Sequence, residues 1–93
     1  MTMHEVRYFL ALCEERNFTR AAKRCDVAQP SLTNAIKSLE SKLGGALFYR
    51  SPSESRLTEL GKLVHPRMKR INQEAARAHK VAQNFNERIF VGR

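Results

Sequence analysis

The sequence predicts a mainly α-helical fold in which three short helices and a two-stranded wing precede one long helix. Apolar residues recur at helical spacing over most of the 93 residues. One short stretch, residues 47–58, instead combines strand-forming residues with a Ser- and Pro-rich centre that favours a turn. The last apolar pattern continues for about three heptads, which is longer than so small a domain buries in its own core.

The first two helices are indicated by two apolar faces with a polar break between them. The apolar face of the first helix consists of Val6, Phe9, Leu10 and Cys13, and its opposite face is expected to carry Glu5, Arg7 and Glu15. Asn17 interrupts this pattern. Thr19 is predicted to cap the second helix, with Phe18 just outside it as a hydrophobic staple. The inner face of the second helix has small residues that let another helix approach closely: Ala21, Ala22 and Cys25.

A third helix is predicted over residues 30–43, after a tight connection at residues 26–28. Pro30 fits its first turn, where the missing N–H is not needed. Gly44 is predicted to end it in a left-handed conformation. The apolar stripe consists of Leu32, Ile36, Leu39 and Leu43, and the opposite face is nearly all polar. We expect this stripe to form the core together with Val6, Phe9 and Phe48.

The wing and the last helix complete the predicted fold. Residues 47–50 and 56–58 read as two short strands joined by a turn. Thr58 is predicted to cap a helix from Glu59 to about residue 86, roughly 40 Å long at ~1.5 Å per residue and bent near Pro66. A heptad seam on this helix predicts a homodimer, with interface residues Val64, Met68, Ile71, Ala75, Ala78, Ala82 and Phe85. The domain boundaries are therefore placed at residues 1–58 and 59–86.

Composition favours a polyanionic partner and disfavours several other classes. The chain has 17 Lys and Arg against 9 Asp and Glu, a net charge of +8 and a pI near 10.2. No apolar run approaches the ~20 residues of a membrane span, and no secretory signal is visible, so we expect a cytoplasmic protein without membrane contact. Cys13 and Cys25 are expected to be buried thiols. The histidines are scattered, so no metal site is expected.

Two helices joined by a short turn, the second with a polar exposed face, form a helix-turn-helix at about residues 18–37. The major groove of B-DNA admits one α-helix, and side chains at the start of the second helix reach the base edges. The first helix of such a pair crosses the backbone, where Thr19, Arg20, Lys23 and Arg24 are placed to meet phosphates. The sequence therefore predicts specific binding to double-stranded DNA.

Several segments together resemble the N-terminal domain of LysR-type transcriptional regulators. The resemblance is carried by residues 18–24 (FTRAAKR), 27–33 (VAQPSLT) and 57–61 (LTELG), and by Leu47-Phe48 with Arg50. It covers about residues 3–85 and implies a winged helix-turn-helix, an antiparallel pair of linker helices and binding to an interrupted inverted repeat near a promoter. It also implies that residues 87–93 begin an effector-binding domain with its first strand, so that a small-molecule effector and a tetramer are expected for the full-length protein. No cofactor is expected in this stretch.

The resemblance also implies roles for individual residues. Gln29, Pro30, Thr33 and Asn34 match base-facing positions of the recognition helix, flanked by Ser31, Lys37 and Ser38, and Arg50 and Arg56 match wing positions near the minor groove or phosphates. Three positions depart from the family. Ala28 stands where a capping Ser or Thr is common, Asn34 stands where many members have Arg, and Glu54 stands at a wing tip that is often basic. Because Asn prefers adenine and Arg prefers guanine, the target bases are expected to differ.

Other function classes fit the sequence less well. A sequence-independent architectural or RNA-binding protein would expose wedging or stacking aromatics, but the five Phe and two Tyr fall mostly on inner faces. A winged helix that contacts only proteins stays open, and comparing specific with scrambled duplex DNA separates it from a DNA-binding domain. An enzyme is the least favoured class, because no paired carboxylates, Cys/His pair or Gly-rich phosphate loop occurs at usable spacing.

Overall fold

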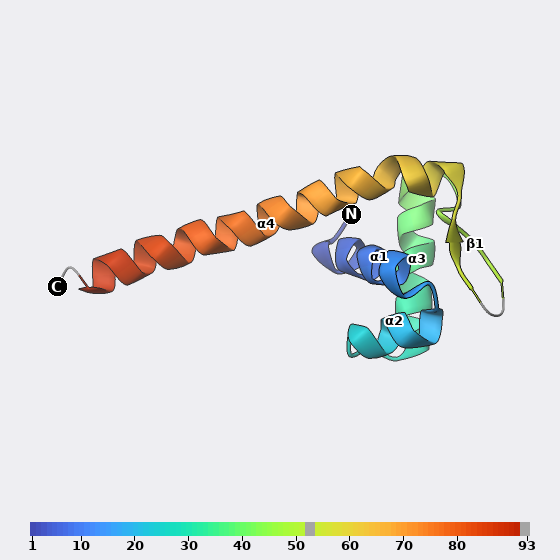
Figure 1. Cartoon of the computed structure of the whole chain (residues 1–93), viewed down its shortest axis with the longest axis horizontal. Helices are drawn as coiled ribbons and strands as arrows, with labels where there is room; N and C mark the ends of the chain where they lie inside the picture. The colour runs from blue at the N-terminus through green and yellow to red at the C-terminus, as the bar shows by residue number, and fades with distance from the viewer. Residues whose placement is uncertain (52–53, 92–93) are drawn as a thin grey trace.

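The computed structural model describes residues 1–51 and 54–91, with side chains described as far as Arg88. Over the described residues, four helices and a two-stranded antiparallel sheet follow one another along the chain (Figure 1). Their bounds are α1 (Met3–Glu15), α2 (Phe18–Arg24), α3 (Gln29–Leu43), β1 (Phe48–Tyr49), β2 (Arg56–Leu57) and α4 (Glu59–Val91). The mainly α-helical winged fold predicted from the sequence is thereby confirmed.

Helix α1 begins with a capping box that the sequence analysis missed. The Thr2 hydroxyl accepts a hydrogen bond from the Glu5 amide, and the Glu5 carboxylate accepts one from the Thr2 amide. The placement of Glu5 on an exposed face is therefore wrong, because Glu5 is only 5% exposed. The apolar face is as predicted, with Val6 and Phe9 fully buried. The helix ends at Arg16, whose left-handed backbone (φ 58°) breaks the helical path.

The helix-turn-helix is formed by α2 and α3, and its first cap differs from the prediction. Asn17, not Thr19, caps α2, since its side-chain oxygen accepts the Arg20 amide at 2.8 Å. Asp26 (φ 57°) makes the sharp turn that follows α2. Helix α3 has no side-chain cap at Ala28 and ends at Gly44 with φ 86°, as the sequence indicated.

The wing is attached to the first turn of α4 through Thr58. Phe48 pairs with Leu57 and Tyr49 with Arg56, so each strand contributes two residues. The Thr58 amide donates to the Leu47 carbonyl at 2.9 Å, and its hydroxyl donates to the Ala46 carbonyl at 2.6 Å. The same hydroxyl accepts the Gly61 amide at 3.0 Å, which confirms Thr58 as the cap of α4. The turn residues 52 and 53 lie outside the described residues.

The core lies where α1, α2, α3, β1 and the start of α4 meet. Leu32, Ile36 and Leu39 are fully buried, and Phe9 contacts Phe48 with ring centroids 5.4 Å apart. Helix α4 approaches the wing closely at Gly61, where a Cβ atom would lie 2.2 Å from the Leu47 carbonyl oxygen. The core therefore unites the helix-turn-helix with the wing and with the first turns of α4.

Helix α4 is longer than predicted and continues far beyond the core (Figure 1). Its 33 residues correspond to about 50 Å at ~1.5 Å per residue, and it runs through Pro66 without ending. The radius of gyration of 16.1 Å exceeds the ~12 Å of a compact chain of this length. The predicted strand at the C-terminal end is wrong as far as Val91, because these residues are helical; residues 92 and 93 lie outside the described part. Among the described helices, none is long and apolar enough to cross a membrane.

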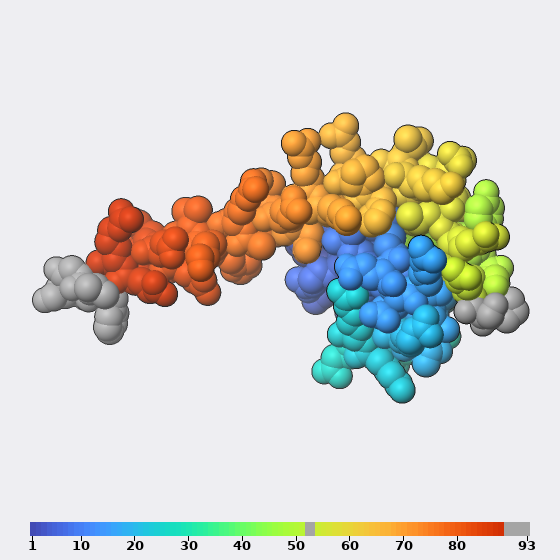
Figure 2. Space-filling model, viewed as in Figure 1, coloured from blue at the N-terminus to red at the C-terminus, as the bar shows by residue number. Residues whose placement is uncertain are grey.

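The predicted seam of α4 divides into two parts. Met68 is 3% exposed, and Val64 and Ile71 pack partly buried against the same core. The prediction that Met68 faces a partner is corrected, because this side chain is enclosed by its own chain. The later seam residues Ala78, Ala82 and Phe85 are exposed, as is Val81, which the heptad pattern missed. Figure 2 shows this distal part projecting with no other part of the chain beside it.

Candidate nucleic-acid interface

The exposed face of α3 carries the side chains that the sequence assigned to base reading. Leu32, Ile36 and Leu39 turn inward and are 0% exposed. This fixes the helical phase, so the opposite face points to solvent. Thr33 is half-buried, and the other predicted residues of this face are exposed: Gln29, Pro30, Ser31, Asn34, Lys37 and Ser38. The structure thus brings these seven residues together on one polar surface of a single helix.

Helix α2 is linked to the first turn of α3 by a side-chain hydrogen bond. The Thr19 hydroxyl donates to the Gln29 amide oxygen at 3.1 Å. Both residues are exposed, so the bond lies at the surface where α2 meets α3. This hydrogen bond orients the Gln29 side chain in the free protein. The NH₂ group of the same amide stays available as a hydrogen-bond donor.

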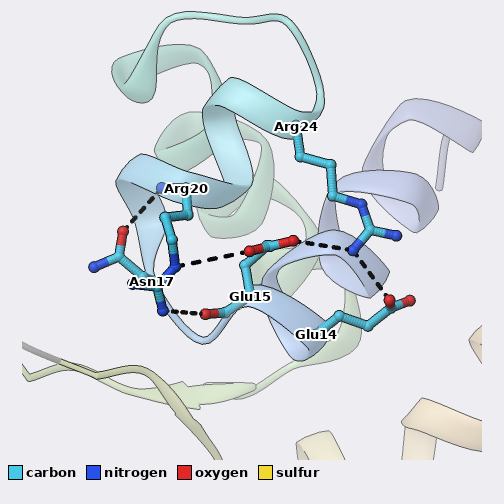
Figure 3. A network of polar contacts seen from close by, with 5 residues as sticks. All are labelled: Glu14, Glu15, Asn17, Arg20 and Arg24. Atoms are coloured by element: carbon cyan, nitrogen blue, oxygen red, sulfur yellow. Dashed lines mark hydrogen bonds and ion pairs between the residues drawn. The ribbon is translucent and has the colours of Figure 1, made fainter.

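Two of the three cations on α2 are paired within the chain (Figure 3). Arg20 donates to the Glu15 carbonyl at 2.7 Å, and its Nε lies 3.7 Å from Glu15 Oε1. Arg24 Nη1 lies 3.0 Å from Glu14 Oε2 and 3.3 Å from Glu15 Oε2. The hydrogen bond from Arg24 lowers the pKa of Glu14, and the same bond raises the pKa of Arg24. Within the described residues, Lys23 has no carboxylate partner.

The wing arginines lie on different sides of the wing. Arg50 Nη2 lies 3.2 Å from Glu40 Oε1, and its guanidinium sits 5.6 Å from the centre of the Phe18 ring. It lines a hollow of about 400 Å³ together with residues of α2, α3 and the wing: Phe18, Gln29, Thr33 and Ser51. Arg56 lines a separate hollow with His65 and Glu59. The structure therefore joins Arg50 to the recognition surface and leaves Arg56 apart from it.

Glu40 holds the wing to α3 and was missed by the sequence analysis. Its Oε2 accepts the Leu47 amide at 2.7 Å, while its Oε1 engages Arg50. The Glu40 side chain is only 14% exposed. Glu54, which stands at a wing tip that is often basic in the family, lies 3.5 Å from Arg16 Nη1. Glu40 and Glu54 are therefore each paired with an arginine of the same chain.

A partly buried ion pair connects the far end of α3 to α1. Lys42 Nζ lies 3.0 Å from Glu5 Oε2, and the Glu5 side chain is 7% exposed. The backbone hydrogen bond from Thr2 lowers the pKa of Glu5 to about 2, helped by Lys42 and Ser38 and opposed by burial. The Thr-x-x-Glu spacing at residues 2–5 was a sequence signal for the capping hydrogen bonds, but it gave no sign of the pair with Lys42.

The thiols have no role at this surface. Cys13 and Cys25 are free and partly buried. Burial raises the pKa of Cys13 to about 12, and it also raises the pKa of Cys25. Burial therefore favours the protonated form of both thiols. Their prediction as inner-face residues agrees with the structure.

Comparison with known proteins identifies the fold. Residues 3–62 match the family described as bacterial regulatory helix-turn-helix protein, lysR family. The chain belongs to the LysR family. It is 33% identical to a probable cat1 operon transcriptional activator of Acinetobacter lwoffii and 34% identical to the transcriptional regulator BudR of Klebsiella aerogenes. Each match covers 99% of this chain, which spans 32% of the first relative and 67% of the second.

A solved structure agrees with this assignment. The DNA-binding domain of CbnR, crystallised as a DNA complex, matches with a TM-score of 0.85 and 33% identity. The match covers 90% of this chain and 97% of that one. The winged helix-turn-helix and long helix of this LysR-family chain therefore correspond to a LysR-type DNA-binding domain.

Proposed function

We propose that this chain binds double-stranded promoter DNA in a sequence-specific manner for a LysR-type transcription regulator acting in the cytoplasm. The supporting observation is the polar face of α3, which is exposed over its first turns while Leu32 and Ile36 anchor the opposite face. A helix of this kind fits the major groove with its N-terminal residues at the base edges. The similarity to the CbnR domain in its DNA complex supports the same use of α3.

In this proposal, base reading belongs to the start of α3. Asn34 is exposed one turn beyond Pro30, and Lys37 follows on the same face. An Asn amide pairs with adenine N6 and N7 through two hydrogen bonds, which discriminate against other bases by about 1–3 kcal/mol. Asn34 would then read an A·T pair in each half-site, and Gln29 would contribute from the first residue of α3. Phosphate contacts would come from Thr19, Lys23 and the Arg50 side of the wing.

The distal part of α4 would join two copies into a homodimer. Ala75, Ala78, Ala82 and Phe85 lie on one side of the helix, flanked by Val81. Small residues let two helices pack closely, and a symmetric pair would carry two recognition helices. Such a dimer fits an interrupted inverted repeat, whose half-sites lie on one face of the DNA. A tetramer and a small-molecule effector are proposed only for the longer proteins of this family.

A binding-site selection tests the proposed base reading. Wild type, Asn34→Ala and Asn34→Arg would each select from a random duplex library, with circular dichroism to check folding. We expect Asn34→Ala to relax one position per half-site and Asn34→Arg to shift that position toward guanine. Asn84→Ala, at an exposed Asn of distal α4, is the matched control and should select the wild-type site. Identical sites from all four proteins would refute base reading by Asn34.

A further inference from the structure

We infer that Glu15 limits the affinity of this domain for DNA, because its carboxylate occupies guanidinium groups on α2 that would otherwise meet phosphates. The inference rests on the proposed DNA-binding function. It assigns a role to a carboxylate on α1, outside the helix-turn-helix itself.

The geometry places Glu15 between two cations (Figure 3). Its Oε1 lies 3.7 Å from Arg20 Nε, and its Oε2 lies 3.3 Å from Arg24 Nη1. The Glu15 side chain is 30% exposed, whereas Arg20 is 62% and Arg24 45% exposed. The carboxylate is therefore the more enclosed member, and both guanidinium groups keep a side that is open to solvent.

The position of the two acids is not explained by the stability of α1. Glu14 and Glu15 lie in the last turn, where the helix dipole disfavours negative charge, and this turn holds no basic residue. Arg20 compensates by donating to the Glu15 carbonyl, one of the unpaired carbonyls at the helix end. The two acids are thus stabilised by the arginines of α2. Their negative charge lowers the positive potential that these arginines give to the surface of α2.

The electrostatic consequence is a reduction in the charge that α2 offers to DNA. The charges of the two arginines are balanced by those of the two glutamates. In the described part of the chain, Lys23 is the cation of α2 that has no carboxylate partner. The log–log salt slope of DNA binding becomes shallower by about 0.9 for each phosphate that the protein leaves unneutralised. Phosphate contacts carry no sequence information, so Glu15 lowers affinity for every duplex and leaves base preference unchanged.

Glu15→Gln tests the inference because it removes the charge and keeps the size of the side chain. We expect the variant to bind both a selected and a scrambled duplex about three- to fivefold tighter at low salt, in the range of an exposed ion pair. The salt slope should steepen by about one. Glu74→Gln is the matched control, since it loses the same charge and a similar pair, 2.7 Å from Arg77, on α4. Equal gains for the two variants would overturn the inference.

A second variant identifies the released cation. Arg20→Gln in the Glu15→Gln background should remove most of the gain, whereas a full gain in the double variant would overturn the role of Arg20. Glu15→Ala should bind as tightly as Glu15→Gln, and urea unfolding checks that each variant folds. If wild type itself shows no salt-dependent DNA binding, the proposed function fails; if wild type binds and Glu15→Gln gives no gain, only this inference fails.

Discussion

The two halves of α4 have the same apolar periodicity but opposite surroundings. In the proximal half, Met68 is 3% exposed and Val64 packs beside it against the winged-helix core. In the distal half, Phe85 is 60% and Val81 68% exposed, although they continue the apolar side of the same helix. Periodicity therefore shows that one side of a helix is suited to burial, but it does not show which surface buries it.

Side-chain size separates the two halves where periodicity does not. The proximal side has large residues, Val64, Met68 and Ile71, which pack against the core that contains Phe9 and Phe48. The distal side has Ala75, Ala78 and Ala82 at the same spacing, and small residues bring helix axes closer together. Large residues thus mark the part that completes a globular core, and small ones mark the part suited to a second helix.

The largest expected effect is on the distal half. Ala78→Glu places a charge in the proposed seam of both copies, and burying an unpaired charge costs several kcal/mol in each. Sedimentation should report a monomer with unchanged helical content by circular dichroism. Ala76→Glu, about 200° around the helix and exposed, should remain a dimer. A dimeric Ala78→Glu protein would place the interface elsewhere.

The next effect is on the proximal half. Met68→Ala removes a side chain enclosed by the core and should lower the free energy of unfolding by about 2–5 kcal/mol, measured in urea. Leu63→Ala is the control on the same turns of the helix, because Leu63 is 71% exposed and should change stability by less than about 0.5 kcal/mol. Similar losses of stability from both variants would contradict the burial difference.

The smallest expected effect is a pH dependence of stability. It should come from Glu5 in the winged-helix part and not from distal α4. The pKa of Glu5 is lowered in the folded chain from 4.5 to about 2, so its stabilisation is complete above pH 4.5 and is lost as pH falls toward 2. Hydrogen bonds to a charged group contribute about 1.5–3 kcal/mol, so the free energy of unfolding should fall by about this amount when Glu5 is protonated. Urea unfolding across this range should show it, and Glu5→Gln should remove the dependence. An unchanged pH profile in Glu5→Gln would assign the acid sensitivity to another group.

The sequence predicted every helix and both strands, because each has a period or a terminal residue with a local cause. It misassigned features that depend on tertiary contacts. Thr19 and Asn17 are both good capping residues, and the Thr19 contact with Gln29 follows only from the packing of α2 on α3. Glu5 was placed on the surface because charge usually is exposed, and its partner Lys42 is 37 residues away.

In the candidate DNA-binding site too, local features were predicted correctly and tertiary contacts were not. The polar face of α3 followed from helical phase, which is a local property, so Asn34 and Lys37 were placed on the exposed face correctly. The pairing of Arg20 and Arg24 with α1 depends on how two helices cross. A count of charges therefore overstates how much positive charge α2 presents to a ligand.

The contacts of Thr58 give α4 a mechanical role. Thr58 bonds to Ala46 and Leu47 in the wing and to Gly61 in the first turn of α4, and Leu47 is bonded in turn to Glu40 on α3. A continuous set of hydrogen bonds therefore connects the wing, α3 and the first turn of α4, and the 33-residue helix projects from this base. A small rotation of α4 about its first turn would displace the C-terminal end of the helix by several ångströms. In the proposed dimer, the angle at which α4 leaves Thr58 would set the separation of the two recognition helices.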